Sequence, residues 1–176
     1  FYPIHVEKPD PALAKQLLDH YGGKYGELTQ VVQYLNHQVN IDGRYLRELL
    51  GLITAEELAH LETLSAMIIK LGGEVKRLTD QNETSWSLTC VNQYSEQEKI
   101  LRANIALEKK ARIAYENHAS MTQDPGVKRL LSFLARREAI HHKLLIRCHK
   151  ILTEDGTAEQ YMELIYDYKM SLQVLD

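Results

Sequence analysis

The sequence predicts an all-α protein, and three observations support this class. Apolar residues recur at intervals of three and four over long segments, as they do on the buried face of a helix. No segment of any length shows the alternating apolar and polar residues of a β-strand. The 9 glycines and 4 prolines mostly stand at breaks between the periodic segments. We therefore expect long helices packed as a bundle.

The predicted helices follow one another in a regular order. A short helix is expected over 12–21, behind a start that is rich in proline. Longer helices are expected over 26–39, 45–71, 95–121 and 123–152, and a short final helix over 157–172. Asp124 before Pro125 is a typical helix start, because the carboxylate caps the first N–H groups and proline fits the first helical position. The polar segment 72–94 is expected to be a long crossover.

Three parts of the chain are distinguished on this basis. Residues 1–25 form an N-terminal segment with a short helix, 26–152 form a four-helix bundle, and 153–176 form a C-terminal helix. A chain of 176 residues is long enough to bury a core without disulfides.

Composition and charge exclude several classes of protein. Hydrophobic residues make up 44% and charged residues 26% of the chain, as in a folded domain. No apolar run reaches the ~18 residues of a membrane span. The net charge of -3 argues against nucleic acid as a partner, because phosphate binding needs a clustered basic surface. Cys90 and Cys148 form no CxxC pair, which excludes a rubredoxin-type module and fits a reducing cytoplasm.

Two of the long helices carry the same polar interruption in an apolar seam. Positions spaced by three and four in the first are Leu46, Leu50, Ile53, Glu57, His60, Leu64, Met67 and Leu71. In the second they are Val127, Leu131, Leu134, Glu138, His141, Leu145, Cys148 and Leu152. In each seam the Glu and the His are three residues apart, so both side chains point into the core.

The other two long helices each carry a Glu with a Tyr seven residues later. These pairs are Glu27 with Tyr34 and Glu108 with Tyr115. Glu27 borders an apolar stripe that we expect to be buried, formed by Leu28, Val31, Val32, Leu35 and Val39. The same number of positions separates Glu27 from Glu57 and Glu108 from Glu138. The chain therefore reads as two similar helical hairpins joined by the crossover.

Four Glu and two His in one core indicate a dinuclear metal site. The set is Glu27, Glu57, His60, Glu108, Glu138 and His141. One Glu from each of two helices, with Glu-x-x-His from each of the other two, is the ligand arrangement of dimetal carboxylate bundles. Buried carboxylates repel one another unless cations neutralise them. Oxygen and nitrogen donors suit manganese or iron. Tyr34 and Tyr115 either orient a ligating carboxylate or fill the core.

The segments that hold these residues resemble the manganese catalase family of the ferritin-like superfamily, including its short spore-coat members. They read Tyr21-Gly-Gly-Lys-Tyr-Gly-Glu27-Leu, Glu56-Glu57-Leu-Ala-His60-Leu-Glu62, Ala106-Leu-Glu108-Lys-Lys-Ala-Arg112 and Leu134-Ala-Arg-Arg-Glu138-Ala-Ile-His141. The resemblance spans about 2–152 and implies a ferritin-like four-helix bundle.

The resemblance also implies a role for each site residue. Glu57 would bridge two metal ions. Glu27 and His60 would complete the shell of one ion, and Glu108 and His141 that of the other. Glu138 would lie at or just outside this shell and relay protons. Tyr34 matches a tyrosine that supports the ligands, so Glu138 and Tyr34 are the expected catalytic residues.

The function implied by the resemblance is disproportionation of hydrogen peroxide at two manganese ions. A diiron oxidase or peroxidase on the same scaffold stays open, because these ligands do not separate iron from manganese. A structural spore-coat component is the third possibility, with the spore coat as the alternative to the cytoplasm. We expect a homo-oligomer, a hexamer by resemblance, because 157–172 carries more apolar surface than a bundle covers. Its apolar residues are Tyr161, Leu164, Ile165, Tyr168 and Leu172.

Overall fold

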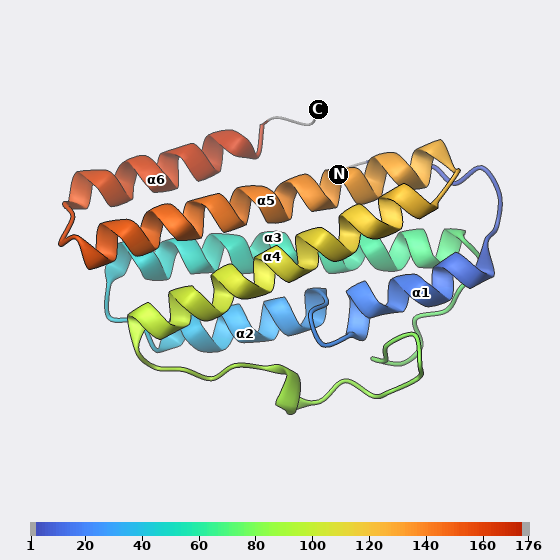
Figure 1. Cartoon of the computed structure of the whole chain (residues 1–176), viewed down its shortest axis with the longest axis horizontal. Helices are drawn as coiled ribbons and strands as arrows, with labels where there is room; N and C mark the ends of the chain where they lie inside the picture. The colour runs from blue at the N-terminus through green and yellow to red at the C-terminus, as the bar shows by residue number, and fades with distance from the viewer. Residues whose placement is uncertain (1–2, 174–176) are drawn as a thin grey trace.

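The chain folds into six α-helices in a computed structural model that describes residues 3–173 (Figure 1). The helices are α1 (Pro11–Gly22), α2 (Glu27–Val39), α3 (Arg44–Lys70), α4 (Gln97–Met121), α5 (Pro125–Thr153) and α6 (Ala158–Ser171). A short 3₁₀ turn spans Leu88–Cys90. Residues 3–173 contain no β-strand, which confirms the all-α class. The ends of the helices lie within a few residues of the predicted ends.

Three helices begin at side chains that cap their first N–H groups. Asp10 accepts from the backbone of Leu13 at 3.0 Å, ahead of α1. Asp124 accepts from two backbone N–H groups at the start of α5, as its position before Pro125 predicts. Thr157 and Gln160 form a reciprocal capping box at the start of α6. Such caps satisfy donors that have no partner within the helix.

The bundle consists of two antiparallel hairpins, α2–α3 and α4–α5 (Figure 1). The connection between α3 and α4 runs along the outside of the molecule, beside α1 and α2 (Figure 1). Helix α6 turns back at the end of α5 and packs on α5 and α3. A long crossover of this kind lets the second hairpin lie beside the first in a ferritin-like bundle.

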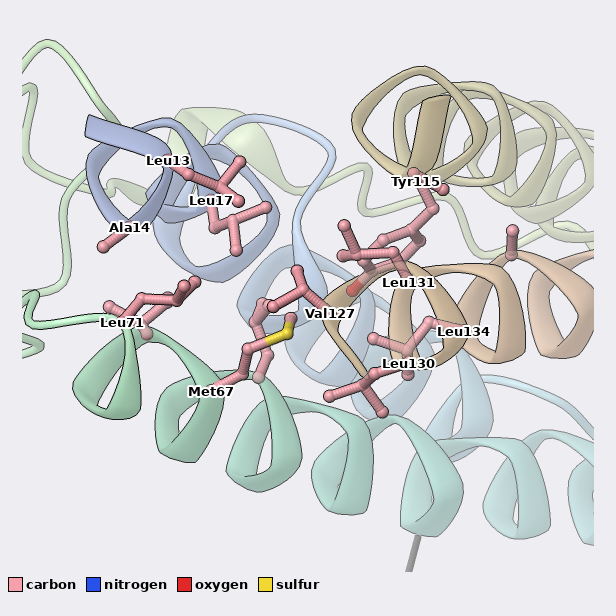
Figure 2. Packing of buried hydrophobic residues seen from close by; sticks show 14 residues of the cluster. Leu13, Ala14, Leu17, Met67, Leu71, Tyr115, Val127, Leu130, Leu131 and Leu134 are labelled. Carbon is pink, nitrogen blue, oxygen red and sulfur yellow. The ribbon is translucent and has the colours of Figure 1, made fainter. Parts of the chain in front are cut away.

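The apolar core is divided into two clusters. One lies where α1 meets α3 and α5, with Leu17, Met67 and Val127 at its centre (Figure 2). The other lies towards the opposite end of the bundle, where Leu50 and Leu145 pack with residues of α6. Along α3 and α5 the Glu-x-x-His segments stand between the residues of the two clusters. The polar residues therefore occupy the middle of the bundle, with apolar packing on either side.

The face that α2 buries differs from the predicted one. The sequence predicts that the apolar stripe is inside, but Leu35 is 54% and Val39 72% exposed, while Leu28, Val31 and Val32 are only partly buried. The side chains that α2 buries are mostly polar: Glu27, Thr29, Gln30, Gln33, Tyr34 and His37. Glu27 points into the centre of the bundle, and residues three, seven and ten positions later follow it on the same face.

The apolar face of α6 is also placed differently from the expectation. Leu164, Ile165 and Tyr168 are buried against the chain's own bundle. Of the residues expected to form an unpaired surface, Leu172 is the exposed one, at 45%. Exposed apolar side chains lie on both helices: Leu35 and Val39 on α2, and Met162, Tyr166 and Met170 on the outer side of α6. No helix within 3–173 is both long enough and apolar enough to cross a bilayer.

Candidate metal centre

All six predicted metal ligands converge in the middle of the bundle. Glu27, Glu57, His60 and Glu138 each offer an atom within 4.8 Å of the others, and Glu57, Glu108, Glu138 and His141 do the same. Their side chains are almost completely buried. Glu57 and Glu138 belong to both groups. The geometry thus forms two adjoining four-residue sites that share two carboxylates.

Local structure places Glu27 at the start of α2. Gly26 directly precedes it, and a Cβ on Gly26 would come within 2.6 Å of the His20 carbonyl oxygen. Only glycine allows the chain to turn this closely behind the end of α1. The Gly-Gly-Lys-Tyr-Gly segment is therefore the tight link that brings Glu27 into the bundle.

The two histidines present equivalent atoms to the cluster. His60 Nδ1 lies 2.8 Å from Glu57 Oε2, and His141 Nδ1 lies 2.7 Å from Glu57 Oε1. His60 Nδ1 is 3.6 Å from Glu138 Oε1, and His141 Nδ1 is 3.6 Å from Glu108 Oε2. Glu57 lies between the two imidazoles, as a bridging carboxylate would.

Several polar atoms of the cluster are buried without a hydrogen-bond partner. They are Glu27 Oε2, Glu57 Oε1, Glu108 Oε2, both carboxylate oxygens of Glu138, and His141 Nδ1. Glu57 Oε1 and His141 Nδ1 lie 2.7 Å apart as an ion pair, but they do not form an aligned hydrogen bond. Leaving such atoms unpaired costs free energy in a core. Four carboxylates and two imidazoles match the charge and the donor preference of two divalent manganese or iron ions. The residues present therefore fit a dimetal centre.

The pKa shifts show how the cluster holds protons. Burial, followed by the charge of Glu57, raises the pKa of Glu27 and Glu138 well above the usual range. Burial also disfavours the charged imidazoles, but neighbouring carboxylates outweigh it and raise the pKa of His60 and His141. For Glu57, burial is outweighed by the two histidines, which lower its pKa to about 2. In the metal-free protein, protons on these side chains thus neutralise the negative charge that metal cations would otherwise neutralise.

The two buried tyrosines connect the hairpins crosswise. Tyr34 of α2 donates to Glu108 Oε1 of α4, and Tyr115 of α4 donates to Glu27 Oε1 of α2. The alternative in which these tyrosines only fill the core is therefore wrong. Each hydroxyl fixes one carboxylate oxygen and leaves the other directed at the cluster.

Glu56 is a site residue that the sequence reasoning missed. Its Oε2 lies 2.8 Å from His141 Nε2, and its Oε1 lies 3.4 Å from His60 Nε2. Arg137 forms a two-pronged pair with it, at 2.5 Å and 3.1 Å. Tyr168 donates to it at 2.7 Å. A carboxylate behind a ligating histidine orients the ring and sets which nitrogen carries the proton.

A signal for Glu56 existed in the sequence. Glu56 stands four residues before His60, so the two share a helix face, and Arg137 likewise stands four residues before His141. Arg137 also donates to the Ser171 carbonyl oxygen at 2.9 Å. Together with the Tyr168 contact, this bond extends the support of the histidines to α6, which no local pattern indicates.

Two further histidines, His20 and His37, are buried, although neither belongs to the cluster. His20 is stacked on Tyr115, with ring centroids 4.0 Å apart, and its Nε2 is 2.7 Å from His118 Nδ1. His37 lies 3.0 Å from the Asn104 amide nitrogen. Gln33 donates to Asn104 at 2.8 Å. These contacts tie α1 and α2 to α4 around the site.

Comparisons of the sequence with known proteins agree with this geometry. The family model "Manganese containing catalase" matches residues 1–85 and 73–162. Protein CotJC of Bacillus subtilis (strain 168) is 30% identical over 88% of this chain and 92% of its own length. A probable manganese catalase of Clostridium acetobutylicum is 26% identical over 90% of this chain and 79% of its own length.

Solved structures share the fold. KatB, a manganese catalase from Anabaena, superposes with a TM-score of 0.83 at 25% identity, covering 86% of this chain and 77% of KatB. The bacterioferritin of Desulfovibrio desulfuricans shares the fold at a TM-score of 0.69 and 20% identity, covering 88% and 87% of the two chains. With the matched family model and the buried carboxylate–histidine cluster, these likenesses lead to one conclusion: the chain belongs to the manganese-containing catalase family.

Proposed function

We propose that the chain is a dimanganese oxidoreductase that disproportionates hydrogen peroxide to water and dioxygen. The observation that carries the proposal is the pair of adjoining four-residue groups that share Glu57 and Glu138. Glu27 and His60 would complete one site, and Glu108 and His141 the other. When bound, two such ions would supply the redox chemistry, because each can change by one oxidation unit and the pair can accept two electrons from one peroxide and return two to another.

Glu138 is the proposed proton carrier of the reaction. Both of its carboxylate oxygens are buried without a hydrogen-bond partner. In the metal-free protein, burial is the largest effect that raises the pKa of Glu138 well above the usual range. A buried carboxyl group with no hydrogen-bond partner of its own can take a proton from one peroxide and return it to the next. Tyr34 supports this step by holding Glu108, which belongs to the same four-residue group as Glu138.

The packing around the cluster supports redox chemistry in a dry site. Apolar clusters lie on both sides of the polar band, and the Glu56–Arg137 pair closes the side next to α6. Exclusion of water strengthens the electrostatic interactions among the ligands. The proposal places the protein in the cytoplasm, since Cys90 and Cys148 are both free thiols, with the spore coat as the alternative.

The test separates three functions. Protein loaded with manganese should hold two ions per chain and release one dioxygen for every two peroxides. Glu138→Gln keeps an oxygen donor at the shared position, so it should retain the ions but lose most of this activity, by about 10²-fold or more, because the amide cannot carry the proton. Iron bound in preference to manganese, with peroxide consumed but no dioxygen released, would favour the diiron oxidase or peroxidase. Two tightly bound ions with no turnover would favour a structural role.

A homo-oligomer, a hexamer by family resemblance, is part of the proposal. Its support is the exposed apolar side of α2, which includes Leu35 and Val39. A row of large apolar residues on one face of a helix is typical of a surface that another chain covers.

A further inference from the structure

Gln30 is a buried side chain to which the proposed chemistry assigns no role. It lies on α2, one turn after Glu27 and one turn before Tyr34. The residue is completely buried, and neither its Nε2 nor its Oε1 has a hydrogen-bond partner. A buried carboxamide offers two donor hydrogens and two acceptor lone pairs. Leaving all of them unmet is unusual in a folded core.

The other unpaired buried atoms show where Gln30 belongs. Among residues 3–173 they lie on five of the six clustered ligands and, outside that set, on Gln30, Asn36 and Arg112. Asn36 and Arg112 are only partly buried as residues, whereas Gln30 is completely buried. Among the described residues outside the ligand set, Gln30 is thus the completely buried one whose polar side-chain atoms have no hydrogen-bond partner. In this respect it resembles the ligands.

Helix geometry directs Gln30 towards the cluster. Residues 27, 30 and 34 lie on one face of α2, and the first and last of them contact the site directly. Helical side chains lean towards the N-terminus, so Gln30 leans over Glu27. The equivalent position on α4, three residues after Glu108, is the buried Ala111. The two helices thus carry a long amide and a methyl group at equivalent positions after their Glu residues.

The opposite side of the cluster is closed. There Glu56, Arg137 and Tyr168 form a connected layer between α3, α5 and α6. These side chains fill the side of the cluster next to α6, whereas Gln30 and Ala111 belong to the helices on the other side, α2 and α4.

We propose that the Gln30 carboxamide hydrogen-bonds the small substrate held at the dimetal centre. Nε2 would donate to a substrate oxygen, and Oε1 would accept the substrate's O–H. Hydrogen peroxide offers both an acceptor and a donor on adjacent atoms, which matches the two ends of a carboxamide. A site built for such bonds discriminates against molecules that lack them. This inference rests on the proposed function.

The experiment uses azide, a small anion that accepts hydrogen bonds, as a probe of the manganese-loaded protein. Gln30→Met keeps the length of the side chain and removes its polar atoms. It should still bind two manganese ions, but its Kd for azide, followed by absorbance, should rise roughly tenfold, as expected for one lost hydrogen bond to a charged group. Its metal-free thermal midpoint should equal or exceed that of wild type, because an unpaired buried amide is removed.

Gln33→Met is the matched control on the same helix. Gln33 donates to Asn104 and accepts from the Asn92 backbone at 2.9 Å. This variant should lower the thermal midpoint and leave the azide Kd unchanged. Gln30→Ala provides a second test in case the Met side chain does not fit.

The outcomes separate the two hypotheses. An unchanged azide Kd in both Gln30 variants, with two ions bound, would overturn the role of Gln30 and leave the metal centre intact. An equal loss of azide affinity in Gln33→Met would also overturn it, since the effect would then be general loosening of α2. Wild-type protein that binds no manganese would overturn the proposed function and this inference with it.

Discussion

At the scale of single residues, Glu56 shows how one carboxylate can orient two proposed metal ligands. It lies behind both imidazoles and is itself held by Arg137 and Tyr168. Because both Nε2 atoms face Glu56, both Nδ1 atoms are directed at the cluster. The orientation of His60 and His141 is therefore set by a residue that need not contact a metal.

Replacement of Glu56 by Gln tests this role. The variant keeps the size of the side chain and loses the charge, so we expect metal affinity to fall by roughly 10–100-fold. The free energy of unfolding should fall by about 3 kcal/mol, because Arg137 is left buried without a countercharge. A chelator competition titration and denaturant unfolding measure the two effects. Glu62→Gln, at an exposed site on the same helix, is the control, and equal metal affinity in both variants would refute the role.

The stability of the metal-free protein should depend on pH. The raised pKa values of Glu27 and Glu138 mean that, above the ordinary carboxyl pKa of 4.5, the unfolded chain loses protons that the folded chain keeps. The stabilising contribution of His60 and His141 is complete below 6.5 and is lost as pH rises through their raised folded pKa. Both effects lower stability as pH rises, whereas the depressed pKa of Glu57 contributes no change above 4.5.

Thermal unfolding between pH 5 and pH 8 checks this expectation. In the presence of a chelator the midpoint should fall steadily as pH rises. With manganese bound, the fall should be absent or reversed, because the ions replace protons and bind more tightly at higher pH. A chelated protein that becomes more stable towards pH 8 would show that the four carboxylates and two histidines are not a coupled buried cluster.

At the scale of elements, α6 supports the proposed metal centre. Tyr168 is buried and donates to Glu56 and, at 3.1 Å, to the Leu52 carbonyl oxygen. Arg137, which pairs with Glu56, also donates to the carbonyl oxygen of Ser171, the last residue of α6. Helix α6 thus supports Glu56, the carboxylate that contacts both histidines. The inward-facing side of α6 supplies this contact through Tyr168.

Tyr168→Phe should reveal this support. The change removes only the hydroxyl, and the loss of its hydrogen bonds should lower the free energy of unfolding by about 1 kcal/mol. Metal affinity should fall measurably, although less than in Glu56→Gln. Tyr166→Phe, at a position 62% exposed on the same helix, should change neither quantity. Identical unfolding curves for the two variants would mean that α6 does not brace Glu56.

At the scale of the whole molecule, the exposed side of α2 bears on assembly. Leu35 and Val39 lie about two turns and three turns beyond Glu27, on the side of the helix that turns away from the centre. Hydrophobicity predicts that the apolar side of α2 forms the core. Because Glu27 points inward instead, the apolar side of the helix faces outward. A second copy of the chain is the proposed cover for this surface.

The double change Leu35→Lys with Val39→Lys should dissociate the proposed oligomer. Charges placed in a buried apolar interface are costly to desolvate, so the mass measured by light scattering should fall to a smaller species. The single change Leu88→Lys, at a residue 58% exposed in the connection, should leave the mass unaltered. A wild-type protein that is already monomeric at micromolar concentration would refute the assembly.

Much of the fold and of the candidate site is local in origin and was therefore predictable. The ends of the helices follow from caps and breaks such as Asp124-Pro125. The two Glu-x-x-His pairs are recognisable because a polar pair on an apolar seam is costly to bury unless a metal ion neutralises it. These features depend on spacing along one helix, which the sequence displays directly.

The tertiary structure alone decided the features that depend on how helices are rotated and paired. Hydrophobicity favoured burial of Leu35 and Val39, yet α2 buries Gln30, Gln33 and His37, because Asn92 and Asn104 from distant segments pair with two of these polar side chains. The crossing of Tyr34 and Tyr115 between hairpins and the contacts of Glu56 with α5 and α6 are likewise long-range. Periodicity identifies a helix face but not its neighbour, and these polar contacts are made only when distant helices come together.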